Sequence, residues 1–270
     1  MLWKRIATAA VLLPLLVASI LYGKGQPYAW PFLLYAGPIA VLCAHEFFRM
    51  FLPAPRDLFA GVLLASGVFL GGALLPCSLA LPVVLSFVLL AAFHAMPGSS
   101  DPAEKVRKGG TLVLGAVYVG GLLSMYPRVL FLPRGELWVL LGVLAVSVGD
   151  TFAYATGRAL GKRKLAPVLS PNKTVEGALG GLFGSVACAV LFALAFLPAI
   201  PAWYAAASGL VVGIAGQAGD LFESLLKRAA GVKDSGTLFP GHGGVLDRAD
   251  AILAAAPPLY LLAAMSPFAA

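Results

Sequence analysis

Long apolar runs dominate this sequence and restrict what it can fold into. A helix that crosses a bilayer needs about 20 mostly apolar residues, and the chain contains about nine such runs. A spanning helix satisfies its backbone hydrogen bonds within its own segment, which the lipid interior requires. We therefore predict an all-α polytopic integral membrane protein with about nine transmembrane helices. The predicted spans are Ile6–Tyr22, Pro27–Cys43, Leu58–Leu75, Leu79–Met96, Gly110–Tyr126, Glu136–Thr156, Val175–Leu197, Trp203–Glu223 and Ala249–Pro267.

The composition supports a lipid-facing surface. Hydrophobic residues make up 60% of the chain and charged residues only 11%, whereas soluble domains carry roughly 25% charged residues. The net charge of +7 on such a chain indicates contact with anionic lipid headgroups or anionic substrates and no nucleic-acid partner. The three cysteines, Cys43, Cys77 and Cys188, form no CxxC pair, so we expect neither a disulfide framework nor a zinc site.

The distribution of basic residues predicts an orientation. Lys4 and Arg5 before the first apolar run are compatible with a cleaved signal peptide, but the run is long enough to span and we expect a retained helix. With a cytoplasmic N-terminus, 16 of the 19 Lys and Arg residues fall on the cytoplasmic side. Only Lys24, Arg128 and Arg134 fall outside. This asymmetry fits the positive-inside rule and predicts that the C-terminus lies outside the cytoplasm. We expect the protein to reside in the cell's inner (plasma) membrane.

The same assignment divides the chain by function. Residues 1–135 form an N-terminal membrane region of about five spans, and residues 136–270 form a C-terminal membrane region of about four spans. The two longest polar segments, 157–174 and 224–248, both fall on the cytoplasmic side. We therefore expect the C-terminal region to carry the chemistry and the active site to face the cytoplasm.

Carboxylates near the cytoplasmic ends of three spans are the first sign of a site. Asp150 lies in an otherwise apolar span, where a charge costs about 2.5–3.5 kcal/mol. Asp220, Glu223, Ser224 and Lys227 follow helical spacing and share one face. Carboxylate oxygens suit Mg²⁺, which combines a few of them with substrate phosphates. Structural pairing of these carboxylates with Lys and Arg explains the spacing equally well.

Two polar loops add the features of a phosphate site. The first contains a glycine-rich turn, Gly241–Gly244, with Lys and Arg residues around it, and such glycines let backbone N–H groups approach a phosphate. The second contains Ser170-Pro171-Asn172-Lys173-Thr174 before a predicted span. Ser170 or Thr174 can cap that helix, and Lys173 with the helix N-terminus can bind an anion. Together with the carboxylates, the loops favour a site for a metal and a polyphosphate.

The segment from Ser224 to Asp250 resembles the signature of the phosphatidate cytidylyltransferases, also called CDP-diacylglycerol synthases. That pattern has S, two residues, K-R, then K-D-S-G, then P-G-H-G-G, then D-R-x-D, and every position is met. The residues are Ser224, Lys227, Arg228, Lys233, Asp234, Ser235, Gly236, Pro240, Gly241, His242, Gly243, Gly244, Asp247, Arg248 and Asp250. The family's usual S-P-K-K-T reads S-P-N-K-T here, because Asn172 replaces the first lysine. The resemblance covers roughly residues 147–251.

The resemblance implies transfer of a cytidylyl group from CTP to phosphatidate, with release of pyrophosphate. It also implies Mg²⁺ with K⁺ as an additional cation, and a homodimer among membrane lipids. Metal binding is assigned to Asp220, Asp247, Glu223 and Asp250, and catalysis to Asp220, Asp247, Lys227, Arg228 and Lys233. Substrate binding is assigned to Ser170, Asn172, Lys173, Thr174, Ser224, Asp234, His242, Gly243, Gly244, Arg248 and Asp150.

Two other functions are compatible with the residues. A secondary transporter places its charges near the membrane midplane and often has repeated halves, whereas the charges here gather toward one side. A CTP-dependent polyprenol kinase transfers the γ-phosphate instead and releases CDP. His45, Glu46 and Arg49, at the end of the second predicted span, and His94 are expected to be structural.

Overall fold

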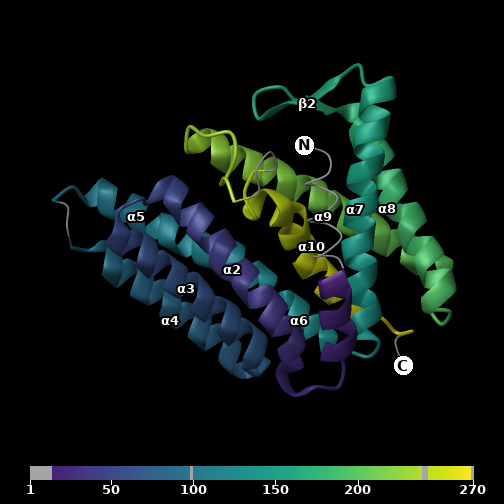
Figure 1. The fold of residues 1–270 in the computed structure, drawn as a ribbon, viewed down its shortest axis with the longest axis horizontal. Coiled ribbons are helices and arrows are strands. Elements are labelled where there is room, and N and C mark those ends of the chain that lie inside the picture. The colour runs from purple at the N-terminus through teal and green to yellow at the C-terminus, as the bar shows by residue number, and fades with distance from the viewer. Residues whose placement is uncertain (1–13, 98–99, 239–242, 269–270) are drawn as a thin grey trace. The chain divides into compact units, whose positions relative to one another are not determined.

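The computed structural model describes residues 14–97, 100–238 and 243–268. Helices account for most of them, which confirms the predicted all-α class (Figure 1). The elements are η1 (Pro27–Ala29), α2 (Trp30–Phe51), α3 (Pro55–Leu74), α4 (Cys77–Ala95), α5 (Pro102–Gly115), η2 (Ala116–Gly121), α6 (Met125–Leu130), α7 (Gly135–Leu160), β1 (Lys164–Ala166), β2 (Ser170–Thr174), α8 (Val175–Phe196), α9 (Ala202–Ala229) and α10 (Leu246–Ala264).

Among the described residues, seven helical segments are long and apolar enough to cross a membrane. They correspond to the second through eighth predicted spans, and one of them, Pro102–Leu130, combines α5, η2 and α6. The first predicted span lies partly outside the described residues, and its described part is a shorter apolar helix, Pro14–Gly23. The ninth corresponds to α10, a 19-residue helix that does not meet the same criteria. The number nine is therefore approximate.

The chain forms two compact units that alternate along the sequence. Unit 1 takes residues 1–19, 26–127 and 234–247, and unit 2 takes residues 20–25, 128–233 and 248–270, as far as these are described. Unit 1 contains α2 to α5, and unit 2 contains α7 to α9 with most of α10. These units are defined by packing, so they do not test the division between an N-terminal region and a catalytic C-terminal region at residue 135, which stays a prediction.

Small residues allow close packing between α7 and α8, which lie side by side in unit 2 (Figure 1). A β-carbon at Gly181 would lie 2.9 Å from the β-carbon of Ala153 and 3.1 Å from the carbonyl oxygen of Gly149. A side chain at this position would force the two backbones apart. Gly177 of α8 permits the same close approach, since a β-carbon there would lie 2.9 Å from the carbonyl oxygen of Ala153.

The polar segment between α7 and α8 forms a hairpin that the sequence did not predict. Strand β1 pairs antiparallel with β2, and Lys164 is the partner of Thr174. Thr174 also caps α8, because its hydroxyl oxygen accepts a hydrogen bond from the Gly177 amide at 3.1 Å. The predicted cap at this helix is therefore confirmed for Thr174. The hairpin fixes the backbone direction of the segment that carries Lys173.

Candidate active site

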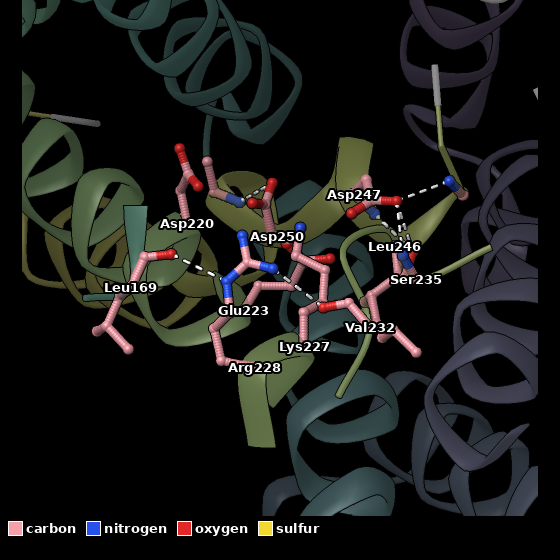
Figure 2. A network of polar contacts seen from close by, with 12 residues as sticks. Leu169, Asp220, Glu223, Lys227, Arg228, Val232, Ser235, Leu246, Asp247 and Asp250 are labelled. Atoms are coloured by element: carbon pink, nitrogen blue, oxygen red, sulfur yellow. Dashed lines mark hydrogen bonds and ion pairs between the residues drawn. The ribbon is translucent and has the colours of Figure 1, made fainter. Parts of the chain in front are cut away.

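The residues that were predicted to share one helical face do lie on one helix. α9 continues to Ala229, so Asp220, Glu223, Ser224 and Lys227 all belong to it. Glu223 is fully buried and forms an ion pair with Lys227, whose side chain is 13% exposed (Figure 2). A buried carboxylate requires such a partner, because desolvation of an isolated charge is very costly. The ion pair therefore fixes the Lys227 side chain on the face of α9 that carries Glu223.

Three carboxylates from different helices gather in unit 2. Asp150 of α7, Asp220 of α9 and Asp250 of α10 are close enough for Asp220 to act electrostatically on both of the others. Gly219 makes the approach of α9 to α10 possible, since a β-carbon there would lie 2.7 Å from the carbonyl oxygen of Asp250. Asp250 is 8% exposed, and one of its oxygens accepts a hydrogen bond from the Ala251 amide at 2.8 Å.

Lys173 of β2 faces this carboxylate cluster. Its ammonium nitrogen lies 2.5 Å from a carboxylate oxygen of Asp220. It also acts electrostatically on Asp150. Lys173 and Asp220 remain about one quarter to one third exposed, at 27% and 34%. The pair is therefore within reach of a polar ligand, and its two charges offset one another in this structure.

Arg228 ties the hairpin to the end of α9 within unit 2. Its guanidinium donates hydrogen bonds to the carbonyl oxygens of Leu169, at 3.4 Å, and Val232, at 3.2 Å (Figure 2). Glu176, at the start of α8, accepts hydrogen bonds from the backbone amides of Lys162 and Arg163. These contacts hold the hairpin and the residues before it against α8 and α9.

Asp247 belongs to unit 1 and has a dense set of donors. One of its oxygens accepts hydrogen bonds from the Ser235 amide at 3.0 Å, the Ser235 hydroxyl at 2.9 Å and the Gly244 amide at 2.7 Å (Figure 2). Gly243 has φ +78°, a conformation that glycine adopts without strain. The turn before α10 is thus folded around the Asp247 carboxylate.

Glu46 of α2 completes this part of unit 1, and the sequence interpretation did not assign it to the site. Its oxygens accept hydrogen bonds from the amides of Val245 and Leu246 and from the hydroxyl of Ser235. Ser235 was likewise absent from the assigned site residues, although it stands in the signature. A signal for Glu46 did exist: it is a carboxylate in an apolar helix, the same argument that singled out Asp150.

The remaining assigned residues are distributed as follows. Asn172, Lys233, Asp234 and Arg248 are exposed, Ser170 is half-buried and Ser224 is buried. His242 lies outside the described residues. The four predicted metal ligands divide between the units, with Asp247 in unit 1 and Asp220, Glu223 and Asp250 in unit 2. Within the described parts of the chain, no three His, Cys, Asp or Glu side chains are arranged to hold a metal ion by themselves.

The seven long apolar helices among the described residues make this a multi-pass membrane protein. The chain matches the Cytidylyltransferase family over residues 3–266. It therefore belongs to the cytidylyltransferase family, as the resemblance predicted.

Curated relatives agree with the family. The chain is 41% identical over 157 residues to a phosphatidate cytidylyltransferase of Bacillus subtilis (strain 168), covering 58% of each protein. It is 41% identical over 155 residues to one of Staphylococcus aureus (strain COL), covering 56% of this chain and 57% of the relative. Over 117 residues it is 53% identical to one of Brucella abortus biovar 1 (strain 9-941), covering 43% of each. The chain thus spans about half the length of these relatives.

Proposed function

We propose that this protein is a phosphatidate cytidylyltransferase, which converts CTP and phosphatidate to CDP-diacylglycerol and pyrophosphate. The observation that carries the proposal is the grouping in unit 2 of Asp150, Asp220 and Asp250 with Lys173. All four residues lie within residues 147–251, the region that the resemblance covers. Relatives that bear the name phosphatidate cytidylyltransferase support the choice of substrates.

The reaction makes modest demands on acid–base chemistry. The nucleophile is a phosphate oxygen of phosphatidate, which is already anionic near neutral pH. It attacks the α-phosphorus of CTP, the new P–O bond forms, and the bond to the pyrophosphate oxygen breaks. The enzyme must bring two anions together and stabilise the charge on the leaving pyrophosphate. Positioning and electrostatic stabilisation therefore supply most of the rate enhancement.

Basic side chains stabilise the negative charge of the reacting phosphates. Lys173 lies beside the carboxylates on a fixed hairpin and is assigned to a phosphate group of the substrates. Lys227 and Arg228 follow on α9, where ion pairing and hydrogen bonds fix their directions. Lys233 and Arg248 are exposed and are assigned to the triphosphate. His242, Gly243 and Gly244 remain assigned to CTP from the signature alone.

The carboxylates of unit 2 fit a magnesium ion by their chemistry. Mg²⁺ usually binds one or two carboxylates and takes its other ligands from water and substrate phosphates. A pair such as Asp220 and Asp250 meets that requirement without a third protein ligand, and Asp247 stays a predicted ligand from the sequence. When bound, the ion neutralises charge on the triphosphate. K⁺ as an additional cation is a further part of the proposal.

The proposed setting follows from the charge distribution. The N-terminus lies in the cytoplasm, the C-terminus lies outside, and the site faces the cytoplasm from the inner membrane. Phosphatidate reaches the site within the bilayer. The resemblance to the family, rather than the charge distribution, is the ground for proposing a homodimer.

A double-label experiment tests the reaction. Purified protein in detergent is incubated with phosphatidate and CTP labelled at either the α- or the γ-phosphate. Cytidylyl transfer moves the α-label into the lipid and releases the γ-label as pyrophosphate. A lipid kinase moves the γ-label into its lipid instead and releases CDP. Lipid labelled only by γ-labelled CTP, or no labelled lipid at all, contradicts the proposal.

A further inference from the structure

A buried carboxylate on α2 binds the backbone of the signature segment. Glu46 is 7% exposed. One of its oxygens accepts a hydrogen bond from the Val245 amide at 3.0 Å, and the other accepts one from the Leu246 amide at 2.9 Å. These amides stand at the start of α10, where the helix dipole favours a negative charge. Hydrogen bonds to an ionised acceptor are roughly twice as strong as neutral ones.

Ser235 links this carboxylate to that of Asp247. Its hydroxyl oxygen lies 3.2 Å from Glu46 and 2.9 Å from Asp247, and it accepts a hydrogen bond from the Asp247 amide. A hydroxyl has a single proton to donate. The two carboxylates therefore share this side-chain donor, and both also accept hydrogen bonds from backbone amides. Any change at Glu46 alters how Ser235 serves Asp247.

Two signature glycines leave room for Glu46. A β-carbon at Gly236 would lie 2.6 Å from the carboxyl carbon of Glu46, and one at Gly244 would lie 2.5 Å from it. No ordinary side-chain contact is that short, so either substitution would displace the glutamate. The glycines thus serve the carboxylate from α2 in addition to shaping the turn.

We propose that Glu46 is a positioning residue for catalysis, which orients Asp247 and the turn before α10 through Ser235 and the amides of Val245 and Leu246. The catalytic part of this inference rests on the proposed function. Glu46 lies outside residues 147–251, from which the site residues were assigned, and the sequence interpretation expected it to be structural. It acts on the reaction only through the segment that it holds.

Glu46→Gln is the test variant. It keeps the size of the side chain but replaces one acceptor oxygen by an NH₂ group, which faces amide donors and cannot accept from them. Glu136→Gln is the matched control, because Glu136 is equally buried, at 6% exposed, and pairs with Lys24 in unit 2. Hydrogen exchange of residues 243–250 is followed by mass spectrometry in detergent. kcat and the KM for CTP are measured on the same folded samples.

In Glu46→Gln, exchange in this segment accelerates by at least about tenfold, because local opening becomes easier. The KM for CTP rises and kcat/KM falls by at least about tenfold, as expected when binding groups are displaced. In Glu136→Gln, the exchange rate of this segment, kcat and the KM for CTP stay within about twofold of the wild-type values. A role in general folding changes only the folded fraction and leaves KM as it was. Normal exchange, or faster exchange with normal KM and kcat, overturns the inference.

A second variant covers a failure to fold. Ser235→Ala removes only the hydroxyl link and is used if Glu46→Gln does not fold. Faster exchange of residues 243–250 with a raised KM for CTP supports the inference. Wild-type exchange and a wild-type KM overturn it. If wild-type protein makes no CDP-diacylglycerol, the proposed function fails. The exchange data then decide alone whether Glu46 holds the segment.

Discussion

The ammonium of Lys173 and the carboxylate of Asp220 form an ion pair at 2.5 Å. Sequence reasoning had assigned the lysine to substrate phosphates and the aspartate to a metal ion. A phosphate is negative, like Asp220, and a metal ion is positive, like Lys173. Binding of a triphosphate and a metal ion would therefore replace the partner that each side chain has now. The pair thus connects the residue assigned to phosphate with the residue assigned to the metal ion.

Lys173→Ala should lower turnover strongly while the protein stays folded, because a phosphate loses its cation. We expect a loss of at least about thirtyfold, or roughly 2 kcal/mol of transition-state stabilisation. Lys164→Ala is the control, since Lys164 is an exposed lysine on the other strand of the same hairpin. Turnover is measured with labelled CTP in detergent. Near-normal turnover in Lys173→Ala contradicts the role of this hairpin.

Asp220→Asn should lower turnover by at least about a hundredfold, or roughly 2.7 kcal/mol. The change keeps the size of the side chain but removes the charge that a metal ion needs. The double variant with Asp250→Asn should be little worse than Asp220→Asn alone, because residues that serve one ion act as a unit. Activity is titrated against Mg²⁺ for each variant. Independent multiplication of the two losses, or an unchanged Mg²⁺ requirement, rules out a shared ion. Asp101→Asn in unit 1 is the control.

Variants of the Glu223–Lys227 pair distinguish an effect on stability from an effect on catalysis. Glu223→Gln leaves a largely buried ammonium without its carboxylate, so we expect a destabilisation of about 3–5 kcal/mol. Replacing both residues, Glu223→Leu with Lys227→Met, should restore most of the stability, because an apolar pair needs no compensation. The double variant should stay inactive, since Lys227 is assigned to a phosphate. Thermal unfolding in detergent and turnover are compared, and an active double variant removes Lys227 from the site.

Asp57 of α3 contacts side chains of α4 and α5 in unit 1. Its carboxylate contacts the ammonium of Lys108 at 2.7 Å and the imidazole of His94 at 2.9 Å, and the three side chains are less than 20% exposed. Asp57→Asn should therefore cost roughly 1–3 kcal/mol of stability with little change in KM. Asp234→Asn, at an exposed position, is the control for stability. Equal melting temperatures for the two variants would show that the contacts are weak.

An external C-terminus follows from an odd number of spans and a cytoplasmic N-terminus. A periplasmic reporter enzyme fused after Ala270 should be active, and a fluorescent reporter that needs the cytoplasm should be dark. The same reporters fused after Ala230, in a predicted cytoplasmic segment, should give the opposite result. A cytoplasmic signal at Ala270 would reverse the side assigned to the C-terminus.

The spans and the Thr174 cap could be predicted because they depend on local pattern. Apolar length predicts a membrane helix, and a Thr before a helix predicts a cap, from a few neighbouring residues. The helical face of Asp220, Glu223 and Lys227 was predictable for the same reason, since α9 extends through all three.

The hairpin and the Glu46 contacts could not be predicted in this way. β1 is three residues long and has too little sequence to show a strand pattern. Glu46 meets Ser235 across 189 residues of chain, and nothing near either residue indicates the other. The pairing of Lys173 with Asp220 likewise depends on how the hairpin lies against α9.

Glu46 has a consequence for how the protein is made. Its amide partners follow it by 199 and 200 residues, and ribosomes add about 5–20 residues per second. For about 10–40 seconds after α2 emerges, the carboxylate has none of the donors that later enclose it. The nascent chain must keep that charge hydrated until residues 235–246 have been synthesised. Assembly of unit 1 is therefore completed late, after the segment that follows α9 has been synthesised.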